Sequence, residues 1–191
     1  MRMDYLGSLT GYLTLPFMYL FGPGVAAARL QPIFFSCVTL VLAFVAGRRW
    51  FGARVAALGV LLLAANPSFI WFSRQGITVT STMTVFSLAS LIALDIARVR
   101  LGAGRGARAA LLAAGLCAGL GLWAKFVFLW WLALLAVMVG VWLLASRQGG
   151  LRGRLALGLR ALPWLGAGFI VGDAPMLLFN LLGARGGSGP P

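Results

Sequence analysis

Six long apolar stretches, separated by short polar or charged segments, make up most of the chain. They cover residues 25–47, 55–72, 78–97, 109–123, 126–145 and 161–182. A helix needs about 20 mainly apolar residues to cross a bilayer, so we take each stretch as one crossing. The apolar stretch at 7–21 is shorter and contains Pro16, so we expect it to lie at the membrane surface. The pattern predicts an all-α integral membrane protein with about six transmembrane helices and an N-terminal interfacial helix.

Breaks and glycine spacings refine this prediction. Asn66-Pro67 interrupts the second stretch, and proline there should bend the helix because it lacks an N–H. The Gly22-Pro23-Gly24 run predicts a turn. Glycines four residues apart, at Gly115/Gly119 and Gly168/Gly172, predict faces on which helices pack closely.

The same pattern sets the expected domain organisation. We expect one polytopic membrane domain over 1–182, made of an extracytoplasmic interfacial segment (1–24) and a transmembrane bundle (25–182). The glycine- and proline-rich stretch 183–191 should be a disordered tail.

Composition supports the membrane assignment and removes several kinds of chemistry. The mean hydropathy is +0.98 and 10% of the residues are charged, against about a quarter in soluble domains. The chain has no histidine and no glutamate, which excludes histidine-activated nucleophiles, histidine metal ligands and glutamate bases. Cys37 and Cys117 fall within spans without metal or redox spacing, so we take them as small apolar side chains. No cofactor is indicated, and a divalent metal stays open.

The basic residues give an orientation. The net charge is +13, which in a soluble protein would suggest a nucleic-acid partner. Here the charges lie between apolar spans, so we expect no nucleic acid. Eleven basic residues fall on one side of the predicted bundle and five on the other. The first set is Arg48, Arg49, Arg54, Arg98, Arg100, Arg105, Arg108, Arg147, Arg152, Arg154 and Arg160. The positive-inside rule places this side in the cytoplasm and both chain ends outside.

Candidate chemistry gathers at the outer level. Arg29, Arg74, Lys125 and Asp173 should all lie there, at the ends of different helices. Three cations from separate helices could surround a phosphate. The alternative is that each cation only anchors its own helix at the lipid headgroups. The basic residues of the other side are expected to set topology and to meet anionic lipid headgroups.

Several short motifs resemble one family of membrane enzymes. They are YLGSLTGY (5–12), LFGPG (20–24), ARLQP (28–32), RRWFG (48–52), ANPSF (65–69) with Arg74, GLGLWAKF (119–126), and GDAP (172–175) with Phe179 and Asn180. In order and spacing they resemble the C-type-fold glycosyltransferases. Within these they are similar to the family 39 group, which is protein-mannosyltransferase-like and includes the aminoarabinose transferases. The resemblance runs from about Tyr5 to Asn180.

The resemblance implies transfer of a sugar from a polyprenyl-phosphate carrier to a lipid, glycan or protein acceptor. The reaction would take place on the extracytoplasmic face of the plasma or inner membrane, among membrane lipids. Arg74 and Lys125 match positions where the family pattern has an arginine and a lysine, so the resemblance implies that they bind the lipid phosphate. Arg29 is the third candidate for this role.

One part of the family pattern is missing. The resemblance implies a catalytic acid in the first outer loop, after a first membrane helix, and both would lie upstream of Met1. Asp4 and Asp173 are the remaining candidates, although Asp4 comes too late in the pattern and Asp173 lies at the wrong end of the chain. We therefore expect an incomplete enzyme, inactive alone. Two non-enzymatic alternatives are a membrane subunit and a small anion or lipid transporter; a transporter should carry mid-membrane charges, which these spans almost lack.

Overall fold

The computed structural model describes the backbone of residues 8–75, 80–145 and 150–185, and the side chains of these residues except 143–145, 150–157 and 181–185. All regular secondary structure in these ranges is helical. The helices are α1 (Leu9–Phe21), α2 (Val25–Phe51), α3 (Ala53–Ala65), α4 (Pro67–Ser73), α5 (Thr80–Gly102), α6 (Arg108–Ala124), α7 (Phe128–Ala145) and α8 (Gly150–Arg185).

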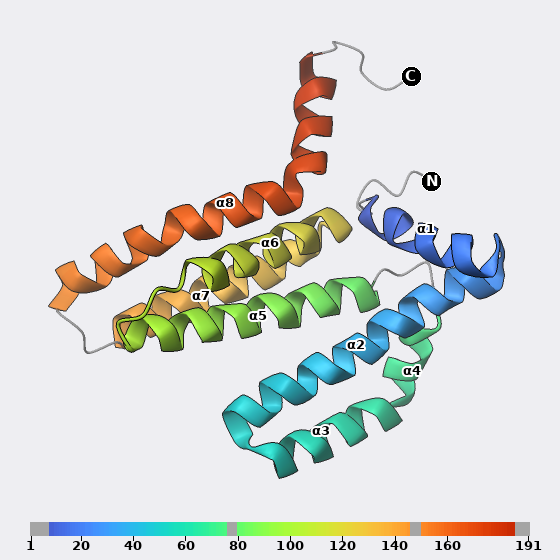
Figure 1. Cartoon of the computed structure of the whole chain (residues 1–191), viewed down its shortest axis with the longest axis horizontal. Coiled ribbons are helices and arrows are strands. Elements are labelled where there is room, and N and C mark those ends of the chain that lie inside the picture. The colour runs from blue at the N-terminus through green and yellow to red at the C-terminus, as the bar shows by residue number, and fades with distance from the viewer. Residues whose placement is uncertain (1–7, 76–79, 146–149, 186–191) are drawn as a thin grey trace.

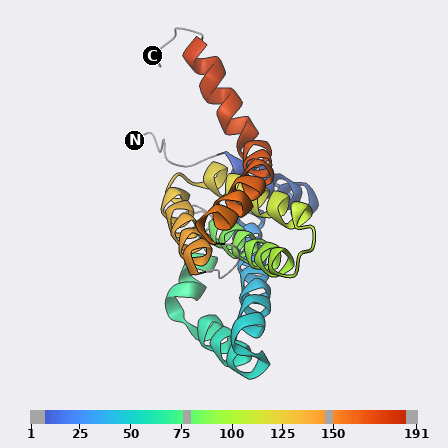
Figure 2. The ribbon, with the colours of Figure 1, turned by 90° about the vertical axis from the view of Figure 1, so that its left-hand side faces the viewer.

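The helices form a layered bundle (Figure 1). Helices α5, α6, α7 and the first part of α8 run side by side, and α6 is packed between α5 and α8. Helix α2 lies along α5, with α3 returning beside it as a hairpin. The short helix α1 packs against α2 and the last turns of α6. The view turned by 90° shows the α2–α3 hairpin extending away from the other helices (Figure 2).

Lengths and hydropathies support a membrane protein. In the described part of the chain, α2, α5 and the Gly158–Asn180 part of α8 are long and apolar enough to span a bilayer. Helices α3 and α4 qualify together as a fourth span, bent by 67°. Helix α6 and the Phe128–Trp142 part of α7 are apolar but shorter. Four of the six predicted crossings therefore meet the length criterion, and the all-helical membrane fold class is confirmed.

The prediction of a basic loop before the last crossing was wrong. Helix α8 begins at Gly150, eleven residues before the predicted start at 161. Arg152, Arg154 and Arg160 are therefore helical. Leucine and arginine, which are strong helix formers, make up seven of the eleven residues from 150 to 160, so helix formation continues past the membrane-length pattern. The turn after α2 is made by Gly52 at φ +89°, a conformation that favours glycine.

The two glycine pairs face each other where α6 crosses α8. A methyl group on Gly115 or Gly119 would overlap the backbone of Leu165 or Phe169 in α8. In return, a methyl group on Gly168 or Gly172 would overlap the backbone of α6. The predicted close-packing faces are thus confirmed, and they are the two halves of one contact. This contact fixes the middle of α8, from Leu165 to Asp173, against α6.

Hydrogen bonds between side chains join α5 to its neighbours. Gln31 donates to Thr82 (3.0 Å), and Ser36 donates to Ser81 (2.9 Å), with all four side chains buried. Such bonds between helices in apolar surroundings contribute about 0.6 kcal/mol each on average. They also fix the register of α2 on α5, because each polar group would otherwise be buried without a partner.

Candidate functional site

The bend between α3 and α4 is built by Asn66 and Pro67. The Asn66 side-chain oxygen accepts hydrogen bonds from the backbone N–H groups of Ser68 (2.9 Å) and Phe69 (3.1 Å). Proline suits the first turn of a helix because its N–H would be unpaired there anyway. The predicted break is confirmed, and it starts a new helix in a new direction. Arg74 is the C-terminal cap of that helix.

Arg74 shares a pocket with Arg29. The pocket has a volume of about 480 Å³ and is lined by Arg29, Pro67, Ile70, Trp71, Arg74 and Gln75. Arg29 comes from the first turns of α2, and the other residues come from α4 and its end. Both guanidinium groups are on exposed residues. The sequence predicted these two cations at one level, and the structure brings them together in one cavity.

The pocket is cationic. Its lining contains no carboxylate. Of the two aspartates in the described part of the chain, Asp95 forms ion pairs with Arg49 (2.9 Å) and Arg98 (3.0 Å), and Asp173 is buried on α8. Guanidinium groups prefer carboxylate and phosphate partners. Two of them beside the apolar and aromatic side chains of Ile70 and Trp71 can therefore hold an anionic headgroup at the edge of an apolar phase.

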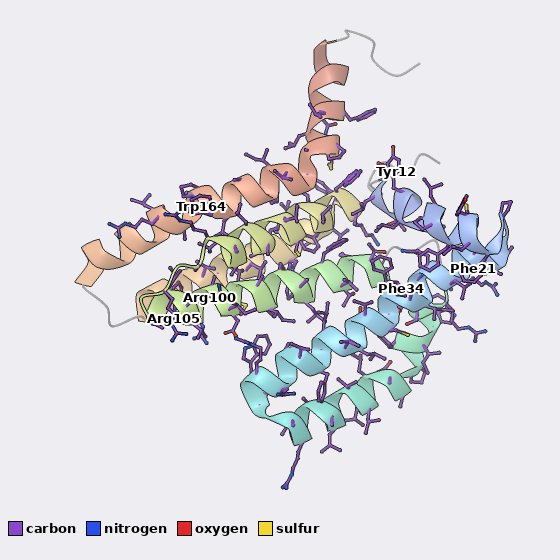
Figure 3. All side chains as sticks on the ribbon, viewed as in Figure 1. Tyr12, Phe21, Phe34, Arg100, Arg105 and Trp164 are labelled. Atoms are coloured by element: carbon purple, nitrogen blue, oxygen red, sulfur yellow. The ribbon has the colours of Figure 1, made fainter. Side chains whose placement is uncertain are left out.

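Lys125 follows the last turn of α6, which packs against α1, and it is outside the lining of this pocket. It caps α6 in an extended conformation, φ −160°, and is half-buried. Its neighbour Trp123 donates a hydrogen bond to Ser8 (3.2 Å) and packs against Tyr12, with ring centres 6.0 Å apart. Tyr12 is labelled in Figure 3 on α1. The structure thus places the end of α6, where Lys125 lies, near α1 and outside the pocket of the two arginines.

The two acid candidates have different outcomes. Asp4 lies outside the described residues. Asp173 is 3% exposed, and one of its side-chain oxygens is buried without a hydrogen-bond partner among the described residues. Its backbone nitrogen lies close to Gly119 on the α6–α8 contact. Asp173 is therefore held rigidly, on a different helix from either arginine of the pocket.

A second, mostly apolar cavity lies on α4 as well. It measures about 310 Å³ and is lined by residues of α2, α3, α4 and α5, among them Phe69, Phe72, Ser73, Thr80, Ser81 and Thr84. The sequence analysis missed this cavity. The hydroxyl-rich start of α5 was its only signal, and that signal did not show which helices would surround it.

The residues that the structure describes show no metal centre. Within these ranges, no three histidine, cysteine, aspartate or glutamate side chains are grouped as metal ligands. Cys37 is exposed and Cys117 is partly buried, and both are free thiols.

Comparison with known proteins places this all-helical membrane fold among the C-type glycosyltransferase folds. The family model for dolichyl-phosphate-mannose-protein mannosyltransferases matches residues 8–171. Since this is most of the sequence, the chain belongs to that family, and the predicted resemblance is confirmed.

One solved structure supports the same assignment. The chain is similar to the crystal structure of ArnT from Cupriavidus metallidurans bound to undecaprenyl phosphate, with a TM-score of 0.64 and 25% sequence identity. The match covers 94% of this chain and 31% of the ArnT chain, so this chain spans about a third of that protein's length. No curated protein matches.

Proposed function

We propose that this chain binds a polyprenyl-phosphate-linked sugar and serves its transfer to a lipid, glycan or protein acceptor at the extracytoplasmic face of the cell membrane. The meeting of Arg29 and Arg74 in one pocket is the observation that carries the proposal. The family and the undecaprenyl phosphate bound to ArnT support it.

The arrangement suits such a donor. The phosphate lies between the two guanidinium groups and accepts charge-assisted hydrogen bonds from them. Such bonds are about twice as strong as those between neutral groups. The isoprenoid chain follows apolar surface, and the cavity on the neighbouring side of α4 offers apolar walls with a few hydroxyl groups. Trp71 lies in the pocket lining, and tryptophan favours the depth at which lipid headgroups meet the acyl chains. Lys125 is the third cation of the proposal.

Donor binding tests the proposal directly. Replacing Arg29 or Arg74 with alanine in the purified chain should weaken binding of undecaprenyl phosphate about tenfold or more. The reason is that a hydrogen bond to a charged group contributes about 1.5–3 kcal/mol. Binding is measured by titration in detergent or nanodiscs. Lys125→Ala, measured alongside, shows whether the donor headgroup also reaches α6.

The matched control is Arg54→Ala. Arg54 is exposed, and it lies in the first turn of α3, whereas Arg74 caps the end of α4, so the two residues are at opposite ends of the α3–α4 pair. The Arg54→Ala variant loses the same charge as Arg74→Ala but lies outside the pocket, so it should leave donor binding unchanged. Equal losses at Arg54 and Arg74 would contradict a phosphate site and indicate a general effect of net charge.

The proposed face of the membrane has its own test. Single cysteines at Ala103 and Ser68, both exposed, are placed in a chain in which Cys37 and Cys117 are alanine. An impermeant thiol reagent added to intact cells should label Ser68→Cys and spare Ala103→Cys, because the arginine excess assigns the α5–α6 connection to the cytoplasm. Labelling of Ala103→Cys alone would reverse the orientation and move the pocket of Arg29 and Arg74 inside.

A further inference from the structure

The arginine-rich end of the bundle has a pocket of its own, between the α5–α6 connection and α8. Its volume is about 410 Å³. Its main lining residues are Leu101, Arg105, Arg108, Leu111, Arg160 and Trp164. Figure 3 shows Arg105 at the end of α5 and Trp164 on α8, on the two sides of this region. Three guanidinium-bearing residues from two separate segments thus line one cavity.

Local structure holds these residues in place. The turn after α5 is closed by a hydrogen bond from the Arg105 N–H to the Arg100 carbonyl (2.8 Å), with Gly104 at φ +67°. The guanidinium group of Arg108 lies over the Trp164 ring, 5.2 Å from its centre. Because α6 is packed on α8 through the glycine contact, the distance between Arg108 and Arg160 is set by two rigid helices.

Charge distinguishes this pocket from the other arginines at the same end. Arg49 and Arg98 both pair with Asp95, whose one negative charge offsets half of their combined positive charge. The pocket lining contains no acidic residue, and the whole chain has three aspartates and no glutamate. Helix α6 begins at Arg108 after Ala107, and alanine has no side chain to cap the N–H groups of the first turn. An anion in this pocket would therefore meet only positive charge.

The remaining lining decides which anion fits. Leu101, Leu111, Ala161 and the body of Trp164 give the pocket an apolar wall beside its three guanidinium groups. Trp164 lies within the Gly158–Asn180 stretch that is apolar enough to span a membrane, so the wall continues into lipid. A free phosphate would leave this apolar surface uncovered, whereas a phospholipid would cover it with its acyl chains.

We propose that this pocket is a specific site for an anionic phospholipid of the phosphatidylglycerol type, with its phosphate held by Arg105, Arg108 and Arg160. Basic pockets between transmembrane helices are known to hold anionic headgroups. The site is separate from the proposed donor pocket, which lies at the other end of α2 and α5. It differs from a diffuse attraction of scattered basic residues because only three of the described arginines take part.

The test compares two double variants that lose the same charge at the same end of the bundle. Arg105→Gln/Arg160→Gln removes two residues of the pocket, and Arg48→Gln/Arg54→Gln removes two exposed arginines outside it. Each purified full-length chain is titrated with phosphatidylglycerol in phosphatidylcholine nanodiscs, and retained lipid is counted by native mass spectrometry. The pocket variant should lose phosphatidylglycerol affinity by about tenfold or more, and the control should keep it.

Two further arms separate the remaining outcomes. Arg105→Lys/Arg160→Lys keeps the charge and should retain a substantial part of the affinity, while circular dichroism checks that all variants keep their helices. Inorganic phosphate, added as a competitor, should not displace the lipid. Equal losses in the two glutamine variants, or displacement of the lipid by inorganic phosphate, would overturn the proposal. The undecaprenyl phosphate titration of the same variants should be unchanged, so failure here is distinguishable from failure of the donor site.

Discussion

Replacing Gly168 with alanine is expected to destabilise the protein, whereas the same change two residues earlier, at Gly166, is expected to stabilise it. A methyl group on Gly168 would overlap the backbone of Leu112, and one on Gly166 meets no atom within 4 Å. Both positions lie inside α8. In a helix interior, alanine is favoured over glycine by about 0.5–1 kcal/mol. At Gly168 the helices must separate, and forced overpacking costs about 1–3 kcal/mol or more.

Thermal unfolding of the two purified variants in the same detergent measures the difference. Gly119→Ala should resemble Gly168→Ala, because Gly119 meets the backbone of Phe169 from the other side of the contact. The double variant should lose less than the sum of the two single losses, since one separation of the helices relieves both overlaps. A gain in stability at both Gly166 and Gly168 would show that α6 and α8 are not in backbone contact.

Phe128→Ala is the second variant with a large expected effect. Phe128 is fully buried, and its ring lies against Gly121, where a methyl group would overlap it. Its N–H donates to the Lys125 carbonyl (2.9 Å), which closes the turn between α6 and α7. Truncation of a buried phenylalanine to alanine costs about 3–5 kcal/mol. We expect a loss of this order, together with a weaker contribution of Lys125 to donor binding.

Phe126→Ala is the matched control. Phe126 belongs to the same turn, but 55% of it is exposed, so its removal leaves no cavity. Unfolding midpoints and undecaprenyl phosphate titrations of the two variants are compared side by side. Similar stabilities for the two would mean that the ring of Phe128 does not hold the turn, and that the position of Lys125 is set elsewhere.

Patterns within single segments predicted much of this structure. The apolar stretches gave the helices, the Asn66-Pro67 pair gave the bend, and the glycine spacings gave close-packing faces, because each feature is decided by neighbouring residues. The predicted start of α8 was wrong because it was placed where the apolar stretch begins. The helix itself extends further, through residues that favour helix formation although they are not all apolar. Charge and hydropathy do not tell which glycine pair meets which, so the reciprocal contact of α6 and α8 came only from the structure.

The sequence also predicted only part of the candidate site. Arg29 and Arg74 were predicted at one level, but their shared pocket depends on the angle that α4 takes after the bend. Lys125 was grouped with them only because it was predicted to lie at the same level of the membrane. The packing of Trp123 against α1 separates it from that pocket. The pairing of Asp95 with Arg49 joins α2 to α5 across 46 residues. No local pattern contains that information.

The hairpin of α2, α3 and α4 carries both arginines of the proposed donor pocket. Among the described residues, its side-chain hydrogen bonds to the rest of the bundle include those of Gln31 and Ser36 to Thr82 and Ser81, and that of Arg49 to Asp95, all on α5. The pocket is thus internal to the hairpin and does not straddle the seam with α5. If the hairpin moved relative to α5, the bound phosphate would move with it. The direction in which the sugar is presented would then change, while Arg29 and Arg74 would stay in contact with the phosphate.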